Sequence, residues 1–246
     1  QQKPLILFDL VSTLTDAGPR YAKAFKEACE DAGQTPPAEE DILAALGEKN
    51  LKEITDYFTD LKDESLVKKF METCNDNCDG LLNDKDWKEH LFPGVRDTLE
   101  KLKKNHTLGI YTGTRENAMA AQLQYHGIKK HFDPAYLRGK DNNRDKWVKS
   151  DVLKREQIES LAAQYRQGQG ILARVIVVGD SVADMKAAKH LGLDFIGFAP
   201  TEKKRKKLAA AGAKNIATRF DTIPALAARI LAAPQSKKAP KPPAAS

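Results

Sequence analysis

Three polar residues of the kinds that do chemistry each follow a short apolar run. Asp9 and Thr112 come directly after such runs, and Asp180 follows another after a single glycine. Near-continuous aliphatic runs of this kind are typical of strands buried on both faces of a parallel sheet. In open α/β sheets, ligands bind beyond the carboxyl ends of the strands. We therefore expect these three side chains to gather at one edge of a sheet, although they are far apart in sequence.

These side chains suit an attack on phosphorus. A carboxylate such as that of Asp9 can act as a covalent nucleophile and form an aspartyl phosphate. Because the carboxylate and the phosphate are both negative, a cation must lie between them, and Mg²⁺ prefers oxygen ligands. Asp9 and Asp180 could each supply one carboxylate oxygen, and Thr112 could donate a hydrogen bond to a phosphoryl oxygen.

The elements that must position these residues are strands that alternate with helices. A helical pattern follows each apolar run within a few residues, which predicts βαβ units and a parallel sheet. Asp194–Phe198 is expected to continue this sheet, and Phe132–Leu137 is expected to add another strand. The expected fold class is α/β, with a doubly wound, Rossmann-like core.

A second pattern, without strands, predicts a small all-helical cap domain inserted after the first strand. Residues 17–90 form this domain, residues 1–16 and 91–232 form the core domain, and residues 233–246, rich in Pro, Ala and Lys, form a disordered tail. Apolar residues between 21 and 32 mark one face of an amphipathic helix, and further helices are predicted at Glu39–Leu46, Leu51–Phe58 and Ser65–Cys74. The two crossings between the domains would serve as hinges that let the cap close over a substrate.

Three segments resemble motifs of the haloacid dehalogenase superfamily. Asp9–Asp16 (DLVSTLTD) resembles its first motif, an Asp-containing loop with Gly-Thr after the first strand. Thr112 and Gly113 match its second motif, a Ser or Thr that ends a strand, and Gly179–Asp184 (GDSVAD) matches its fourth motif, Gly-Asp-x-x-x-Asp. The motifs occur in the family's order with a helical insert after the first, and the resemblance covers about residues 4–231.

The third motif of this superfamily is a lysine between the second and fourth motifs. Lys149 is the best match because it begins a helix before the last motif, and Lys140 and Lys146 are rivals. The resemblance implies that this lysine neutralises charge on the phosphoryl group and that Gly113 belongs to the phosphate-binding loop. It also implies that Asp184 holds the lysine or a metal-bound water, a supporting role.

The resemblance further implies a hydrolase that uses Mg²⁺. Asp9 would be both nucleophile and metal ligand, Asp180 a second ligand, and the main-chain carbonyl of Val11 the third protein ligand. Phosphatases of this superfamily carry an Asp at the position of Val11, which protonates the leaving alcohol and then activates water. General acid–base catalysis is typically worth about 10²–10⁴-fold, so a phosphatase without this group is expected to be slow.

Val11 leaves several activities open. The chain could be a phosphatase with reduced activity, or a phosphate-binding or regulatory protein that lost turnover. It is also similar to phosphonoacetaldehyde hydrolases, which have a small apolar residue at this position and cleave a P–C bond with the help of a cap lysine. Lys49 is the nearest candidate for that lysine, with Lys52 behind it. A 2-haloacid dehalogenase ranks third, since the acidic pair of the fourth motif suits a metal that this reaction does not need.

Composition excludes several other classes of function. The net charge is +6, but acidic residues are mixed in almost everywhere, so no nucleic-acid partner is expected, and the basic run at 203–207 is interpreted as a solvated helix start. No apolar run approaches the roughly 20 residues of a membrane span, and the three cysteines suit packing in a reducing compartment. We expect a cytoplasmic protein with a small phosphorylated substrate. The sequence predicts no oligomeric state.

Overall fold

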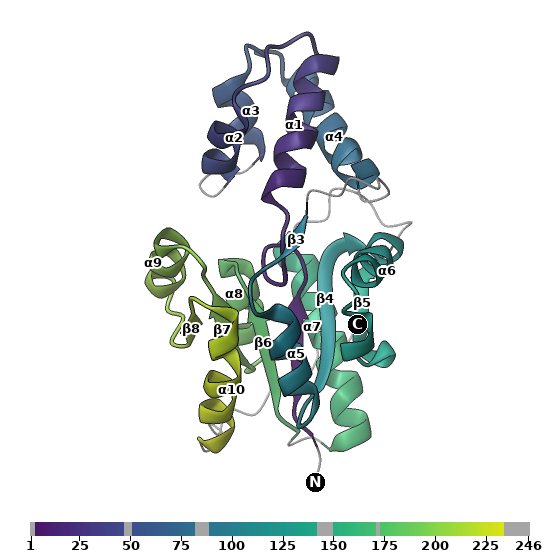
Figure 1. Cartoon of the computed structure of the whole chain (residues 1–246), viewed down its shortest axis with the longest axis vertical. Coiled ribbons are helices and arrows are strands. Elements are labelled where there is room, and N and C mark those ends of the chain that lie inside the picture. The colour runs from purple at the N-terminus through teal and green to yellow at the C-terminus, as the bar shows by residue number, and fades with distance from the viewer. Residues whose placement is uncertain (1–2, 47–50, 82–88, 142–149, 171–172, 234–246) are drawn as a thin grey trace. The chain divides into compact units, whose positions relative to one another are not determined.

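The chain forms two compact units in the computed structural model (Figure 1). We call Gln1–Leu14 with Leu91–Ser246 the core unit and Thr15–His90 the helical unit. The structure describes residues 3–46, 51–81, 89–141, 150–170 and 173–233. That residues 17–90 act as a cap domain stays a prediction, and the expected tail lies, except for Ala233, outside the described residues.

Within the part of the core unit that the structure describes, six strands form one parallel sheet. Its strands are β1 (Leu5–Asp9), β4 (Thr107–Arg115), β5 (Leu137–Lys140), β6 (Val175–Gly179), β7 (Asp194–Phe198) and β8 (Ile216–Ala217). They lie in the order β5-β4-β1-β6-β7-β8, and each neighbouring pair is parallel. From β1 the chain winds outward in one direction and then in the other, so the order reverses between β1 and β6. The doubly wound α/β fold is therefore confirmed, and ligands of such sheets bind at this switch point.

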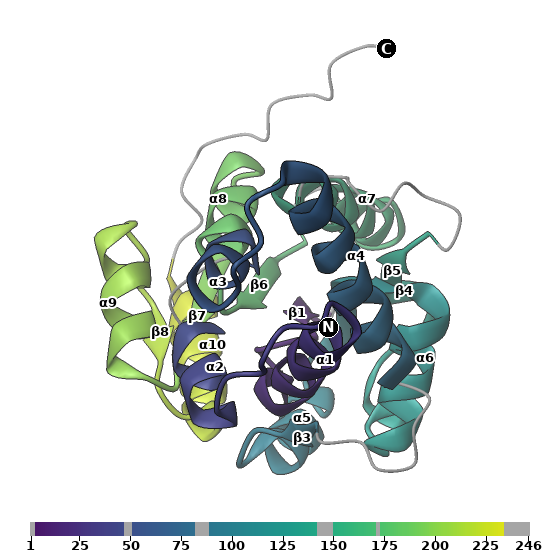
Figure 2. The ribbon, with the colours of Figure 1, turned by 90° about the horizontal axis from the view of Figure 1, so that it is seen from above.

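Helices cover both faces of the sheet (Figure 2). On one face pack α5 (Val95–Lys103), α6 (Glu116–Tyr125) and α10 (Ile223–Ala232), and on the other pack α7 (Ser150–Gln169) and α8 (Val182–His190). Successive side chains of a strand point to opposite faces, and β1 shows this clearly. Ile6 and Phe8 enter the first apolar core, whereas Leu5 and Leu7 enter the second. All four are fully buried, which explains why the run reads as continuously apolar.

The described residues of the helical unit form four helices with an apolar core of their own. They are α1 (Gly18–Asp31), α2 (Glu39–Leu46), α3 (Leu51–Phe58) and α4 (Glu64–Gly80). The short strands β2 (Thr15–Asp16) and β3 (His90–Leu91), near the ends of this unit, form a two-stranded sheet. Arg20 and Glu89 form a buried ion pair, with Nε and Oε2 2.7 Å apart. Because they lie near the two ends of the unit's chain, the pair ties these ends together.

Two helices of this unit have the predicted bounds, and one is longer than predicted. Glu39–Leu46 and Leu51–Phe58 are helices as predicted. The helix predicted at Ser65–Cys74 continues to Gly80, because Cys78 lies on the same buried face as Cys74. Cys29, Cys74 and Cys78 are buried and form no disulfide.

The sheet departs from the sequence expectations at two places. Phe132–Leu137 is wrong as a strand: Pro134–Tyr136 forms a 3₁₀ turn, and β5 begins only at Leu137. Asp133 caps this turn through its side chain, and Pro134 has no N–H to give to a ladder. Thr112 was also expected to end a strand, yet β4 continues to Arg115. It does so because β4 pairs with β5 beyond the point where its pairing with β1 stops.

The remaining core elements lie outside the central sheet. Helix α9 (Glu202–Ala210) connects β7 to β8, and 3₁₀ turns occupy Lys129–His131 and Phe220–Thr222. No helix among the described residues is long and apolar enough to cross a membrane.

Candidate active site

Asp9 is the last residue of β1 and lies at the switch point of the sheet. Its carboxylate is buried: Oδ1 accepts a hydrogen bond from the Leu10 N–H at 2.9 Å, and Oδ2 accepts one from Lys154 Nζ at 2.8 Å. Burial raises the pKa of Asp9, Lys154 lowers it, and Asp184 and Asp180 raise it again, to about 7. Removal from water and two neighbouring negative charges together disfavour the ionised form. A further positive charge beside Asp9 would favour the carboxylate that a nucleophile needs.

The loop after Asp9 turns sharply at Ser12. Ser12 has a φ of +63°, and no other described residue except glycine has a positive φ. Glycine adopts this conformation without strain, and the family's first motif has glycine here. The turn brings the Thr13 hydroxyl to 3.5 Å from Asp180 Oδ1, at the edge of hydrogen-bonding distance. The half-buried Val11 side chain packs against the apolar core, and it offers no titratable group.

Asp180 directly follows β6, and Asp184 lies in the first turn of the next helix. Ser181 caps α8 in a capping box, in which Asp184 Oδ2 accepts from the Ser181 N–H at 3.0 Å and from Ser181 Oγ at 2.6 Å. Asp184 Oδ1 accepts from the Tyr111 hydroxyl at 3.1 Å. A Cβ at Gly179 would come within 2.6 Å of the Asp184 side chain, so only glycine fits there. Asp184 is therefore held rigidly in place.

Lys154 forms ion pairs with two of these carboxylates, and the sequence analysis did not predict it as a site residue. Its Nζ lies 2.8 Å from Asp9 Oδ2 and 2.9 Å from Asp184 Oδ1. Burial lowers the pKa of Lys154, but the attraction of the three nearby carboxylates outweighs it and holds this pKa above its usual value. The sequence does hold a signal: Lys154 precedes Ile158 by four residues and Leu161 by seven, so it shares the buried face of α7.

The sequence also offered other candidate lysines. Lys149, Lys146 and Lys49 lie outside the described residues. Lys140 ends β5 and is buried.

Thr112 follows Tyr111, which is the parallel partner of Asp9 across β1 and β4. Its hydroxyl is fully buried and accepts a hydrogen bond from the Thr114 N–H at 3.2 Å. Its carbonyl accepts a hydrogen bond from Gln157 Nε2 at 2.9 Å, so α7 holds this part of β4. Gly113 is exposed, and a Cβ placed there would meet no atom within 4 Å.

The carboxylates of Asp9, Asp180 and Asp184 form one cluster. One oxygen of each lies within 4.8 Å of the others. Asp180 Oδ2 also accepts from Lys204 Nζ at 2.6 Å. Burial raises the pKa of Asp180, Lys204 lowers it, and Asp184 raises it. With Lys154 and Lys204 charged, three carboxylates leave one net negative charge, and hard oxygen donors with surplus negative charge suit a divalent cation such as Mg²⁺.

Comparisons with known proteins find a matching family, similar sequences and a similar fold. The profile of the family described as "Haloacid dehalogenase-like hydrolase" matches residues 6–198. A phosphoglycolate phosphatase from Vibrio parahaemolyticus is 26% identical over 208 residues, covering 80% of this chain and 84% of that protein. A phosphorylated carbohydrates phosphatase from Thermotoga maritima is 26% identical over 217 residues, covering 85% and 91%. The structure of a haloacid dehalogenase-like family hydrolase from Streptococcus pneumoniae matches with a TM-score of 0.70 at 18% identity, covering 91% of this chain and 98% of that one, which shows a shared fold.

Proposed function

Because this chain belongs to the haloacid dehalogenase-like hydrolase family, we propose that it hydrolyses a small phosphate monoester with Asp9 as nucleophile and Mg²⁺ as cofactor. The names of its relatives support this substrate class. They are a phosphoglycolate phosphatase and a phosphatase of phosphorylated carbohydrates, both of which act on small phosphorylated molecules. Phosphoglycolate and sugar phosphates are therefore the first substrates to test.

One observation carries the proposal: three carboxylates meet at the switch point of the sheet, with a buried lysine between two of them. Asp9 and Asp184 are both buried, and Lys154 bridges them. A fold gains little stability from buried charges of like sign, because taking them out of water costs several kcal/mol each. Such a group is typical of a site that must bind and neutralise another charged molecule.

In the proposed reaction, a carboxylate oxygen of Asp9 attacks phosphorus and forms an acyl phosphate. The bond from phosphorus to the ester oxygen breaks, and its electron pair leaves with the alkoxide, which takes a proton from water. Water then attacks this intermediate, which releases inorganic phosphate and restores the Asp9 carboxylate. Lys154 lies 2.8 Å from Asp9 Oδ2 and neutralises charge on the phosphoryl oxygens while the phosphoryl group is transferred.

Mg²⁺ would supply the positive charge that lets a carboxylate approach a phosphate. In this proposal Asp9 and Asp180 hold it, together with the main-chain carbonyl of Val11. Both oxygens of Asp184 already accept hydrogen bonds, which suits a role in positioning Lys154. Thr112 would donate its hydroxyl proton to a phosphoryl oxygen, with Gly113 beside it in the phosphate-binding loop.

Val11 sets the expected rate. The Val11 side chain cannot protonate the leaving alkoxide, so turnover should be slow for substrates with poor leaving groups. A chain that binds its phosphorylated ligand and turns it over very slowly is the second candidate, and Val11 is the observation that favours it.

A substrate panel tests the proposal. Phosphoglycolate, sugar phosphates, phosphonoacetaldehyde and 2-haloacids would be assayed with Mg²⁺ and with EDTA. We expect release of inorganic phosphate from at least one ester, loss of it in EDTA, and loss of it in Asp9→Asn. Asp97→Asn, which changes an exposed Asp in the first turn of α5, should behave as the wild type. Full activity of Asp9→Asn, or turnover of only a phosphonate or haloacid, would overturn the proposal.

A further inference from the structure

Lys204 pairs with the carboxylate cluster through Asp180. It belongs to a run of five basic residues, Lys203–Lys207, that begins near the start of α9. Arg205 bonds Glu202 through two nitrogens at 2.7 and 2.6 Å, and Lys206 lies 4.0 Å from the same residue. Lys204 instead places its Nζ 2.6 Å from Asp180 Oδ2, with 26% of its side chain exposed. A helix start in solvent does not need this contact.

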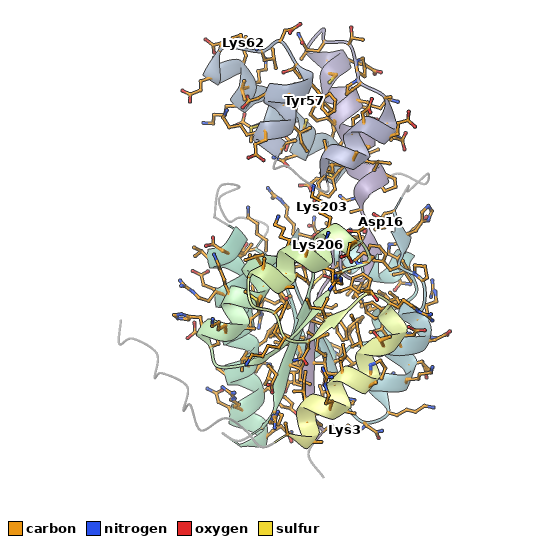
Figure 3. All side chains as sticks on the ribbon, turned by 90° about the vertical axis from the view of Figure 1, so that its left-hand side faces the viewer. Lys3, Asp16, Tyr57, Lys62, Lys203 and Lys206 are labelled. Carbon is orange, nitrogen blue, oxygen red and sulfur yellow. The ribbon has the colours of Figure 1, made fainter. Side chains whose placement is uncertain are left out.

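The local backbone fixes the position of Lys204. Thr201 caps α9 by accepting a hydrogen bond from the Lys204 N–H at 3.3 Å. Lys204 therefore leaves the helix in its first turn, and its side chain reaches Asp180, the residue after β6. Lys203 and Lys206 come from the same helix (Figure 3). Lys206 is 75% exposed at its side chain and serves as a matched reference.

The charge that Lys204 adds has opposite effects on two ligands. Because Lys204 donates to Asp180 Oδ2, Oδ1 is left as the oxygen that can face a cation, and the Thr13 hydroxyl lies 3.5 Å from it. Lys204 also reduces the negative charge that a divalent cation meets. Once a divalent cation is bound, however, two lysines and three carboxylates give the site a net charge of plus one. Without Lys204 the same loaded site would be neutral and would attract a phosphoryl dianion less.

We propose that Lys204 is a tuning residue that weakens binding of the divalent cation and strengthens binding of the phosphoryl group. The inference rests on the proposed function, because it takes Asp180 as a cation ligand. Lys204 acts through Asp180, so it changes the affinity of the site for the cation even when no substrate is present. A lysine that only stabilised α9 would not change that affinity.

The test measures each ligand separately in Lys204→Met, which keeps most of the length of the side chain and removes its charge. Calorimetric titration with MgCl₂ alone, at fixed ionic strength, gives the cation affinity of the full chain. Titration with inorganic phosphate at saturating Mg²⁺ gives the affinity for the phosphoryl group. We expect Lys204→Met to bind Mg²⁺ about tenfold more tightly, or about 1.4 kcal/mol, and phosphate about tenfold more weakly. Lys206→Met should stay within twofold of the wild type for both ligands.

The outcomes separate a failure of this inference from a failure of the proposed function. If the wild type binds no Mg²⁺ at all, both fail. If it binds Mg²⁺ but Lys204→Met has an unchanged or weaker affinity, only the role of Lys204 is overturned. Lys204→Gln repeats the measurement should the methionine variant not fold, which circular dichroism would reveal. Agreement of the two neutral variants excludes an effect of the methionine side chain itself.

Discussion

Replacing Lys154 with methionine should destabilise the core unit as well as impair catalysis. The change removes the cation that lies 2.8 Å from Asp9 and 2.9 Å from Asp184, and it leaves both carboxylates buried. The methionine fits the apolar part of the site, because Lys154 shares the buried face of α7 with Ile158 and Leu161. The cost therefore comes from unpaired charge rather than from lost packing.

The magnitude follows from the two ion pairs. At an effective dielectric constant of about 20, each contact attracts by roughly 6 kcal/mol, most of which offsets the removal of the lysine from water. Breaking a buried pair by removing one partner costs about 3–5 kcal/mol. Asp9 can relieve part of this cost by taking up a proton, since its pKa already lies at about 7. We therefore expect a loss of about 3 kcal/mol in the free energy of unfolding, near the lower end of that range.

Urea denaturation in EDTA measures this loss, and Arg155→Met is the control. Arg155 is the next residue of α7 and is exposed, so its replacement should change the free energy by less than about 0.5 kcal/mol. Mg²⁺ should restore part of the stability of Lys154→Met, because a bound cation stabilises by about 2.7 kcal/mol at a hundred times its Kd. Turnover with Mg²⁺ should fall about 10²–10³-fold. A variant as stable as the wild type in EDTA would show that Lys154 does not neutralise this cluster.

Three further changes have distinct expected results. Val11→Asp should speed hydrolysis of phosphate esters by roughly 10²-fold or more because it supplies an acid–base group, whereas Val11→Asn should not. Equal rates for the two variants in a phosphate-release assay would show that a missing acid–base group does not limit turnover. Ser12→Gly should raise the free energy of unfolding by about 1 kcal/mol, because glycine adopts the positive φ without strain. Ser160→Gly, on the exposed face of α7, should lower the free energy of unfolding. A loss of stability in both variants would contradict strain at Ser12. Tyr111→Phe should cost about 1 kcal/mol, because it removes the hydroxyl that bonds Asp184, and an unchanged urea midpoint would argue against that contact.

Much of the fold was predictable because its strands are buried on both faces. Every side chain of β1 and β6 is buried, so each strand forms an apolar run whose end can be read from the sequence. Failures came where a neighbouring strand or a turn decided the structure. Pro134 and the cap at Asp133 delayed the start of β5, and pairing with β5 carried β4 past Thr112.

The sequence by itself determined that Asp9 and Asp180 meet, since residues at the carboxyl ends of parallel strands lie at one edge of the sheet. Only the tertiary structure decided which lysines join them. Lys154 reaches Asp9 because of where α7 begins and how it is rotated against the sheet, and Lys204 reaches Asp180 because Thr201 fixes the first turn of α9. Such contacts depend on packing between elements far apart in the chain. The spacing of Lys154 can place it on the buried face of α7, but it does not show that this face meets Asp9.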